Sequence, residues 1–324
     1  MELPAQLRQG VEAMLDGTPL SALKDAGRAL SQRYRAEVRD GRLHMADSLA
    51  VKAYLAQRLP ATYAAVRAAM GDLEGARPDF SPATLLDIGA GPGTALWAAA
   101  ETWPSLGRAT LLEASAHARA AGQALAAALP LRCDWLSGDA TLSLPDTGAA
   151  DLVTVAYVLD ELPPAALPKL VERLWAFTAG TLLVVEPGTP AGWRRILDVR
   201  AQLVAAGGHV AAPCPHEAAC PLAEPDWCHF SRRVARSRLH RLAKDADVPW
   251  EDEKFSYLAV SRQPASERAA RVLAPPKAGS GKVTLKLCRP DGTAAERLFT
   301  KRDGAIFRAA RRADWGDALD TGAE

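Results

Sequence analysis

The spacing of apolar positions along the chain changes near residue 79. Before that point Ala, Leu and Val recur at helical spacing without strand-like alternation, and Asp47 or Ser48 stands where a helix cap is expected. Beyond it, short apolar runs alternate with alanine-rich or amphipathic stretches of helical length. This alternation predicts an α/β fold whose mostly parallel sheet is covered on both faces. The runs that predict its strands cover residues 85–88, 109–112, 132–136, 152–157 and 182–185.

The pattern continues after residue 185 with a predicted helix over 191–206, a basic helical stretch over 234–244 and a strand over 255–261. Residues 274–281, Ala-Pro-Pro-Lys-Ala-Gly-Ser-Gly, have the composition of a linker. Beyond them, 282–288 alternates like a strand, and it is expected to pair with 297–300 across a turn as a β-hairpin.

These patterns divide the chain into three predicted regions. An N-terminal helical region covers 1–78, and an α/β core covers 79–262 with a cysteine-rich insertion at 209–232. A basic extension, 263–324, contains the hairpin that carries Cys288.

Composition and charge narrow the setting in which the protein works. The 324 residues are 48% hydrophobic and 24% charged, which is ordinary for a folded protein. The first residues do not resemble a secretory signal, and no apolar run reaches the roughly 18 residues that span a bilayer, so we expect a reducing cytoplasm and no membrane.

The net charge of +1 conceals two basic segments: 229–244 has six Arg or Lys and no acid, and 262–312 has thirteen basic residues against four acidic ones. Such segments suit a polyanionic partner or, alternatively, form a solvated surface.

Four of the five cysteines are expected to form a metal site. Cys214, Cys220 and Cys228 follow one another with intervals of five and seven residues in a proline-rich stretch, and Cys288 is a candidate fourth ligand. In a reducing compartment, clustered cysteines are more often metal ligands than disulfides. Both zinc and an iron–sulfur cluster suit four thiolates, and His216 or His229 is an alternative zinc ligand. A closed four-cysteine site leaves no position for water, which argues against a metal-dependent hydrolase.

The fifth cysteine, Cys133, lies in an alternating strand pattern. It is expected to be a small buried apolar side chain.

A glycine loop, Asp87-Ile88-Gly89-Ala90-Gly91-Pro92-Gly93-Thr94, stands where the first predicted strand ends and a helix begins. Glycines there let the backbone approach a ligand, and the helix N-terminus offers free N–H groups. A dinucleotide fingerprint requires glycine at position 94, where this chain has threonine. The loop resembles motif I of class I S-adenosylmethionine-dependent methyltransferases. That resemblance implies donor binding by Asp87, Gly89, Gly91 and Gly93, with Glu113 at the ribose and Asp139 at the adenine.

Residues for catalysis are less clear than residues for binding. Asp160 and Glu161 follow the fourth predicted strand and are candidate bases, or they only hold a loop. The aromatic residue of an Asp-Pro-Pro-aromatic motif is missing there, and no cysteine nucleophile replaces it.

Further motifs resemble a family of methyltransferase-like proteins of small ribosomal subunit assembly, known in mitochondria and bacteria. They include Pro213-Cys214-Pro215-His216, Asp226-Trp227-Cys228-His229-Phe230, Glu253-Lys254-Phe255-Ser256-Tyr257 and Trp315-Gly316-Asp317. The resemblance implies that Cys214, Cys220, Cys228 and Cys288 hold a 4Fe-4S cluster, with zinc as the competing metal. It also implies binding of small-subunit ribosomal RNA and assembly intermediates.

The RNA contacts expected from the two basic segments are Arg232, Arg233, Arg236, Arg238, Arg241, Lys301, Arg302, Arg308, Arg311 and Arg312. The free chain is expected to be monomeric. Two functions remain open at this point: an assembly factor with a methyltransferase fold, and an active methyltransferase that modifies ribosomal RNA.

Overall fold

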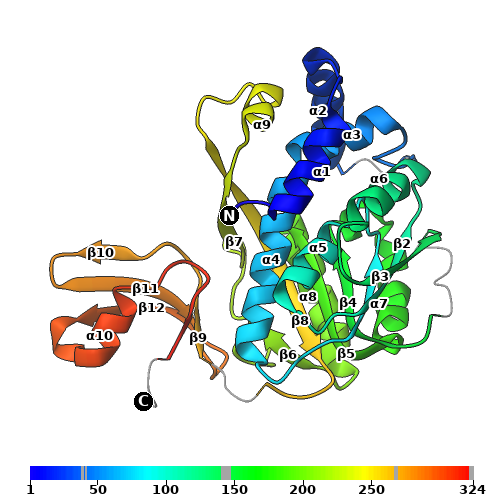
Figure 1. Ribbon diagram of the computed structural model, residues 1–324. Coiled ribbons are helices and arrows are strands. Elements are labelled where there is room, and N and C mark those ends of the chain that lie inside the picture. Colours follow the sequence, from blue (N-terminus) through cyan, green and yellow to red (C-terminus); the bar gives the residue numbers. More distant parts are fainter. Residues whose placement is uncertain (38–39, 41, 140–146, 266–268, 321–324) are drawn as a thin grey trace.

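The structure, a computed structural model, describes residues 1–37, 40, 42–139, 147–265 and 269–320. Most of the molecule is an α/β core with the N-terminal helices packed against it, and a small antiparallel sheet lies beside this core (Figure 1). No helix in the described part of the chain is long and apolar enough to cross a membrane.

The N-terminal region is helical, as predicted. The Asp47 side chain caps the third helix by accepting a hydrogen bond from the Ala50 N–H at 2.8 Å. Pro60 lies in the first turn of the fourth helix, where no intrahelical partner for its nitrogen is needed, so the proline begins a helix there. The helices are α1 (Ala5–Leu15), α2 (Leu20–Arg35), α3 (Ser48–Gln57) and α4 (Leu59–Ala76).

The central sheet has the strand order β3-β2-β1-β4-β5-β8-β6. Its first five strands run parallel, β8 runs antiparallel to β5 and to β6, and β7 pairs with the first half of β8. All five strands predicted for the core are present. The strands are β1 (Thr84–Ile88), β2 (Arg108–Glu113), β3 (Arg132–Ser137), β4 (Ala150–Ala156), β5 (Thr178–Pro187), β6 (His209–Ala212), β7 (Phe230–Ala235) and β8 (Trp250–Ser261).

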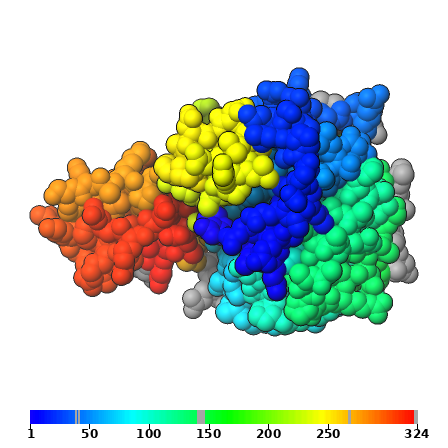
Figure 2. Space-filling model, turned by 45° about the horizontal axis from the view of Figure 1, so that its top comes forward, coloured from blue at the N-terminus to red at the C-terminus, as the bar shows by residue number. Residues whose placement is uncertain are grey.

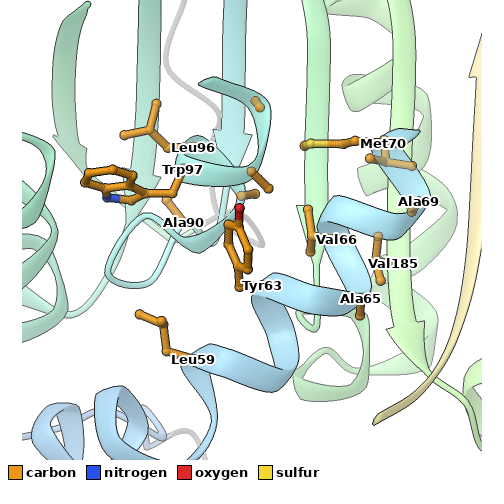
Figure 3. Close-up of a cluster of buried hydrophobic side chains, with 14 of the residues drawn as sticks. Leu59, Tyr63, Ala65, Val66, Ala69, Met70, Ala90, Leu96, Trp97 and Val185 are labelled. Carbon is orange, nitrogen blue, oxygen red and sulfur yellow. The ribbon is translucent and has the colours of Figure 1, made fainter. Parts of the chain in front are cut away.

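Both faces of this sheet are buried, because successive strand residues enter different cores. Leu85 packs with the helices of the N-terminal half, and Leu86 packs on the opposite face. On the first face α4 presents Tyr63, Val66 and Met70 toward the sheet and toward its neighbouring helix (Figure 3). Helices α5 (Thr94–Thr102) and α6 (Ala116–Ala126) also pack on that face, and α7 (Leu167–Ala176) and α8 (Pro190–Ala205) cover the other.

The chain from β7 through α9 (Arg238–Ala243) to the first half of β8, residues 230–254, forms an arm beside the N-terminal helices (Figure 1). Lys24 of α2 forms an ion pair with Asp245, which follows α9 in the sequence. The helix predicted over 234–244 is wrong at its start, because Val234 and Ala235 pair with Glu251 and Trp250 as strand residues. Cross-strand pairing there overrides local helix propensity.

The small sheet is built around β11, which pairs with β12 on one side and with β10 and β9 on the other. The predicted hairpin is confirmed. The predicted linker 274–281 is wrong, because residues within it form β10 and Gly281, at φ +68°, makes the turn into β11. The elements are β9 (Ala270–Val272), β10 (Lys277–Gly279), β11 (Lys282–Cys288), β12 (Ala294–Thr300), a 3₁₀ turn η3 (Lys301–Asp303), α10 (Gly304–Ala310) and β13 (Ala318–Leu319).

The buried hydroxyl of Tyr63 allows a paired test of the core. Its ring is 1% exposed, and its hydroxyl has no hydrogen-bond partner among the described residues. We expect Tyr63→Phe to leave the free energy of unfolding unchanged or to raise it, because an unpaired polar group is removed. Tyr63→Ala should lower it by about 3–5 kcal/mol by opening a cavity. Urea denaturation measures both, and a large loss in Tyr63→Phe contradicts this account of the core.

Candidate functional site

A cavity of about 1010 Å³ opens at the carboxyl ends of β1, β2 and β4. The N-terminal region, the glycine loop, the loop after β4 and the arm all line it. Parallel sheets bind ligands at this edge, and the volume is at the upper end of the range for small-molecule sites. Every residue that was predicted to bind the methyl donor lines this cavity, except Gly93, whose neighbour Thr94 does. After that prediction, the cavity is called the donor pocket below.

The glycine loop has a backbone that other residues adopt only under strain. Gly89, Gly91 and Gly93 have φ values of +68°, +54° and +83°. A Cβ atom on Gly89 would lie 2.4 Å from Cγ2 of Val158 in the loop after β4. The carboxylate of Glu113 holds the loop, because it accepts the N–H groups of Gly91 at 2.8 Å and Ser115 at 2.7 Å.

Buried acids give the donor pocket a wall suited to a cationic group. Oδ1 of Asp87 accepts the Thr154 hydroxyl at 2.7 Å, while Oδ2 is buried without a partner among the described residues. Burial raises the pKa of Asp87 to about 7. Asp139 is exposed at the mouth of the same pocket. A cation beside Asp87 would therefore satisfy Oδ2 and keep the carboxylate ionised.

The two candidate bases lie on a 3₁₀ turn, η1 (Leu159–Glu161), in the wall of this pocket. Burial raises the pKa of Glu161 to about 8, with the neighbouring Asp160 as a second cause. Glu186 of β5 fixes this turn, because its carboxylate accepts the Leu159 N–H at 3.2 Å and pairs with Arg195 at 2.7 Å. The structure thus brings Asp160 and Glu161 to the glycine loop, and it equally supports a structural role for them.

Other pocket residues had no recognisable pattern in the sequence. Tyr157, directly after β4, has a left-handed backbone with φ +57°, and its hydroxyl donates to Glu253 at 3.0 Å. Strained residues of this kind cluster at functional sites. The segment that contains Met45 lies against the glycine loop. It is held there because the Ser115 hydroxyl donates to the Met45 carbonyl at 2.6 Å. Only the three-dimensional packing places these residues together.

A second, small cavity of about 30 Å³ is lined by all four clustered cysteines, Cys214, Cys220, Cys228 and Cys288. They come from three places in the fold. Cys214 and Cys220 follow β6, Cys228 precedes β7, and Cys288 ends β11 in the small sheet. The distant fourth ligand predicted from sequence therefore reaches the same cavity as the other three. This feature is called the thiol cavity below.

Two buried arginines border the thiol cavity. Arg200 of α8 is 5% exposed and donates to the carbonyls of His216 and Ala218, both at 2.8 Å, while its Nε has no partner among the described residues. Arg271 of β9 is 6% exposed, donates to the carbonyls of Pro213 at 3.1 Å and Gly316 at 2.7 Å, and lies 3.4 Å from a carboxylate oxygen of Asp72. Buried cations held mainly by carbonyls favour a negatively charged neighbour. Thiolates in the cavity would supply that charge.

Burial by itself opposes ionisation of the thiols. Burial, together with the nearby Cys214 and Cys220, raises the pKa of Cys288 to about 12. In the described part of the chain no group of three or more His, Cys, Asp or Glu side chains could hold a metal ion. The thiols surround a cavity without meeting at one point. A metal would therefore need the side chains to close in, or an inorganic core that spans the space between them.

The remaining sulfur and imidazole candidates are placed as follows. His216 is buried in the wall of the thiol cavity, with Nε2 3.4 Å from Sγ of Cys288. His229 stacks on Trp227 at 4.9 Å between ring centroids and does not line the cavity. Cys133 lies on β3, half-buried against the core.

The predicted RNA contacts fall into two groups, one on the arm and one on the small sheet. On the arm, Arg233 pairs with Asp252 at 2.9 Å and Arg236 pairs with Glu251 at 2.9 Å. The second group lies on η3, on α10 and directly after α10, is exposed, and consists of Lys301, Arg302, Arg308, Arg311 and Arg312. In a space-filling view the arm, in yellow, lies between the N-terminal helices in blue and the small sheet in orange and red (Figure 2).

The strand order, the antiparallel β8 and the glycine loop at the end of β1 define a Rossmann-like methyltransferase fold. This confirms the predicted fold class. A family model described as mitochondrial small ribosomal subunit Rsm22 matches residues 48–320. The chain belongs to that family, which confirms the resemblance found in its motifs.

Two relatives show how much of the chain is shared. The human protein described as "Ribosome assembly protein METTL17, mitochondrial" is 32% identical over 290 residues, covering 82% of this chain and 61% of the relative. The "Rsm22-cox11 tandem protein 2, mitochondrial" of Schizosaccharomyces pombe is 22% identical over 326 residues, with 82% and 42% covered. The chain thus spans about three fifths of the first relative and about two fifths of the second.

Solved structures resemble the chain more distantly. The magnesium protoporphyrin IX methyltransferase of Synechocystis PCC 6803, with bound SAH, is 13% identical at a TM-score of 0.42, covering 72% of this chain and 94% of that one. TehB from Haemophilus influenzae is also 13% identical, at a TM-score of 0.39, with 60% and 62% covered.

The geometry of the glycine loop predicts a sharp difference between two alanine substitutions. Gly89→Ala meets both an unfavourable φ and the Val158 side chain, and we expect it to lower the free energy of unfolding by about 1–3 kcal/mol. Gly107→Ala, where a Cβ meets nothing within 4 Å, is the matched control and should change it by less than about 0.5 kcal/mol. Equal urea midpoints for the two variants would show that the loop is not constrained as described.

Proposed function

We propose that the protein is an assembly factor of the small ribosomal subunit, built on a methyltransferase fold. The observation that carries this proposal is the match of residues 48–320 to a family described by the small ribosomal subunit. The human relative is itself described as a ribosome assembly protein. The compartment stays a prediction: a reducing cytoplasm is expected from the sequence, while the relatives are described as mitochondrial.

The donor pocket is proposed to bind S-adenosylmethionine. This ligand carries an ammonium group and a sulfonium centre, and the pocket offers a buried, unpartnered carboxylate oxygen on Asp87. Glu113 keeps lone pairs on both carboxylate oxygens after its two backbone contacts, so it can still accept ribose hydroxyls. The exposed Asp139 would lie at the adenine. S-Adenosylmethionine, when bound, supplies a methyl group that an aligned nucleophile can accept.

The thiol cavity is proposed to hold a 4Fe-4S cluster, with zinc as the alternative. The fit rests on four thiols around one space and on the two buried arginines beside them. Arg200 and Arg271 would balance the negative charge of four thiolates. A cluster when bound would supply bonds between the core and the small sheet, and its binding energy would then add to the folding energy.

Small-subunit ribosomal RNA is the proposed partner of the basic groups on the arm and on α10. Charges on and directly after α10 are the more available, since Arg308 and Arg312 have no acidic partner among the described residues, whereas Arg233 and Arg236 are paired. The alternative function is an active ribosomal RNA methyltransferase. It is supported by the position of Asp160 and Glu161 in the donor pocket.

Sedimentation with immature small subunits tests the proposed function. We expect the tagged protein to move with these particles and to be released as salt rises from about 50 to 200 mM, because phosphate contacts are salt-dependent. Arg308→Glu with Arg312→Glu should weaken the association at least tenfold. The matched double variant Lys169→Glu with Arg173→Glu, on α7, should not. Absence of wild-type protein from every small-subunit fraction contradicts the proposal, and labelled methyl transfer in the same particles would favour the enzyme.

Metal analysis of anaerobically purified protein tests the thiol cavity. We expect about four iron atoms per chain and absorbance near 400 nm, as is typical of such clusters. Cys288→Ser should lose most of the iron, because one of the four thiols is removed. Cys133→Ser, on β3 away from the cavity, is the control and should keep it. One zinc ion per chain without that absorbance would replace the cluster by the alternative metal.

A further inference from the structure

The arm carries three exposed large apolar side chains, called the apolar patch below, that the proposed function does not yet explain. Leu242, Val248 and Trp250 are 44%, 44% and 42% exposed and lie within nine residues of one another. Large apolar side chains grouped on a surface mark binding sites more often than scattered ones do. The arm stands on an exposed face between two other units (Figure 2).

Positive charge is distributed unequally between the two sides of the arm. On the side toward the core, Arg236 and Lys244 both pair with the one carboxylate of Glu251, at 2.9 Å and 2.6 Å, so each cation there has an acidic partner. On the outer side, Arg238 and Arg241 of α9 are exposed, and neither has an acidic partner in the described part of the chain. The unneutralised charge therefore lies on the same short stretch as the apolar patch.

Trp250 is held in a fixed position within this patch. It begins β8 and pairs with Ala235 of β7 in an antiparallel register. The guanidinium of Arg233 lies 5.4 Å from its ring centroid, and Asp252 fixes that guanidinium through two hydrogen bonds of 2.9 and 3.1 Å. A side chain restrained in this way loses little conformational freedom when it binds a ligand.

We propose that the arm tip binds unpaired bases of RNA, with Trp250 as the stacking surface and Arg238 and Arg241 at the phosphates. This inference rests on the proposed RNA partner and specifies its form. Single strands expose the flat faces of their bases, and aromatic side chains stack on them, whereas an A-form duplex hides those faces. The combination of indole and unpaired guanidinium groups favours RNA over a purely apolar protein partner.

Binding of two RNAs to the full-length, metal-loaded protein tests the inference. The probes are a labelled unstructured pyrimidine 16-mer and a duplex of the same length, measured by fluorescence anisotropy. Trp250→Ala should weaken binding of the single strand about tenfold, in line with the loss of one stacked base, and change duplex binding little. Trp250→Phe, which keeps an aromatic face, should stay within about threefold of wild type. Trp250→Leu, which keeps apolar area alone, should behave like the alanine variant.

The charged residues have a separate readout. Arg238→Ala with Arg241→Ala should reduce the slope of log affinity against log salt by about two, because two phosphate contacts are lost. Each variant is first checked for an unchanged thermal midpoint and metal content, so that misfolding is separated from lost contacts.

The possible failures can be told apart. If wild type binds the single strand and all three Trp250 variants bind it equally well, the arm-tip inference is overturned while the RNA partner stands. If wild type binds neither RNA nor immature subunits, the proposed function fails first. If Trp250→Ala keeps full RNA affinity but loses a crosslink to a ribosomal protein in immature particles, the patch is a protein contact and the inference is again overturned.

Discussion

The convergence of four cysteines and two buried arginines is the constraint on which the arrangement of the units depends. Cys288 and Arg271 enter this point from the small sheet, and Arg200 enters it from the core. In the described part of the chain Arg200 has no acidic partner and Arg271 has one, Asp72 at 3.4 Å, while burial raises the pKa of Cys288 to about 12. A metal held by four thiolates, as proposed, would place negative charge beside both arginines and keep the thiolates ionised, so the small sheet and its basic helix are expected to follow the state of this cavity.

The arm connects that cavity to the donor pocket. Cys228 stands two residues before β7, and the far end of the arm lines the donor pocket with Arg236 and Lys244. One β-ribbon thus has the thiol cavity at its base, the pocket on its inner side and the apolar patch at its tip. Under the proposed function, this ribbon would organise an RNA-binding surface on a methyltransferase fold, with or without transfer of a methyl group.

The sequence predicted the core well, because its signals are local. Apolar runs, glycines and the Asp47 cap each reflect one strand, one turn or one helix end. The prediction was wrong where secondary structure depends on residues distant in the sequence. Val234 and Ala235 are strand residues because they pair with β8, and residues 277–279 are strand residues because they pair with β11. Residues with a motif could be predicted as site residues, whereas Tyr157, Arg200 and Trp250 could not, since the roles proposed for them rest on strain, burial and exposure in the folded chain.

Hydrogen exchange on the full chain, before and after the proposed metal is stripped under anaerobic conditions, tests most directly whether the thiol cavity holds the small sheet to the core. We expect the amides of β9 and β11 to lose protection from exchange when the metal is removed, because the thiol cavity would no longer hold the small sheet to the core. Amides of β1, β4 and β5 should keep theirs, since their protection comes from the two hydrophobic cores. Unchanged protection in β9 and β11 would contradict the claim that the thiol cavity holds the two units together.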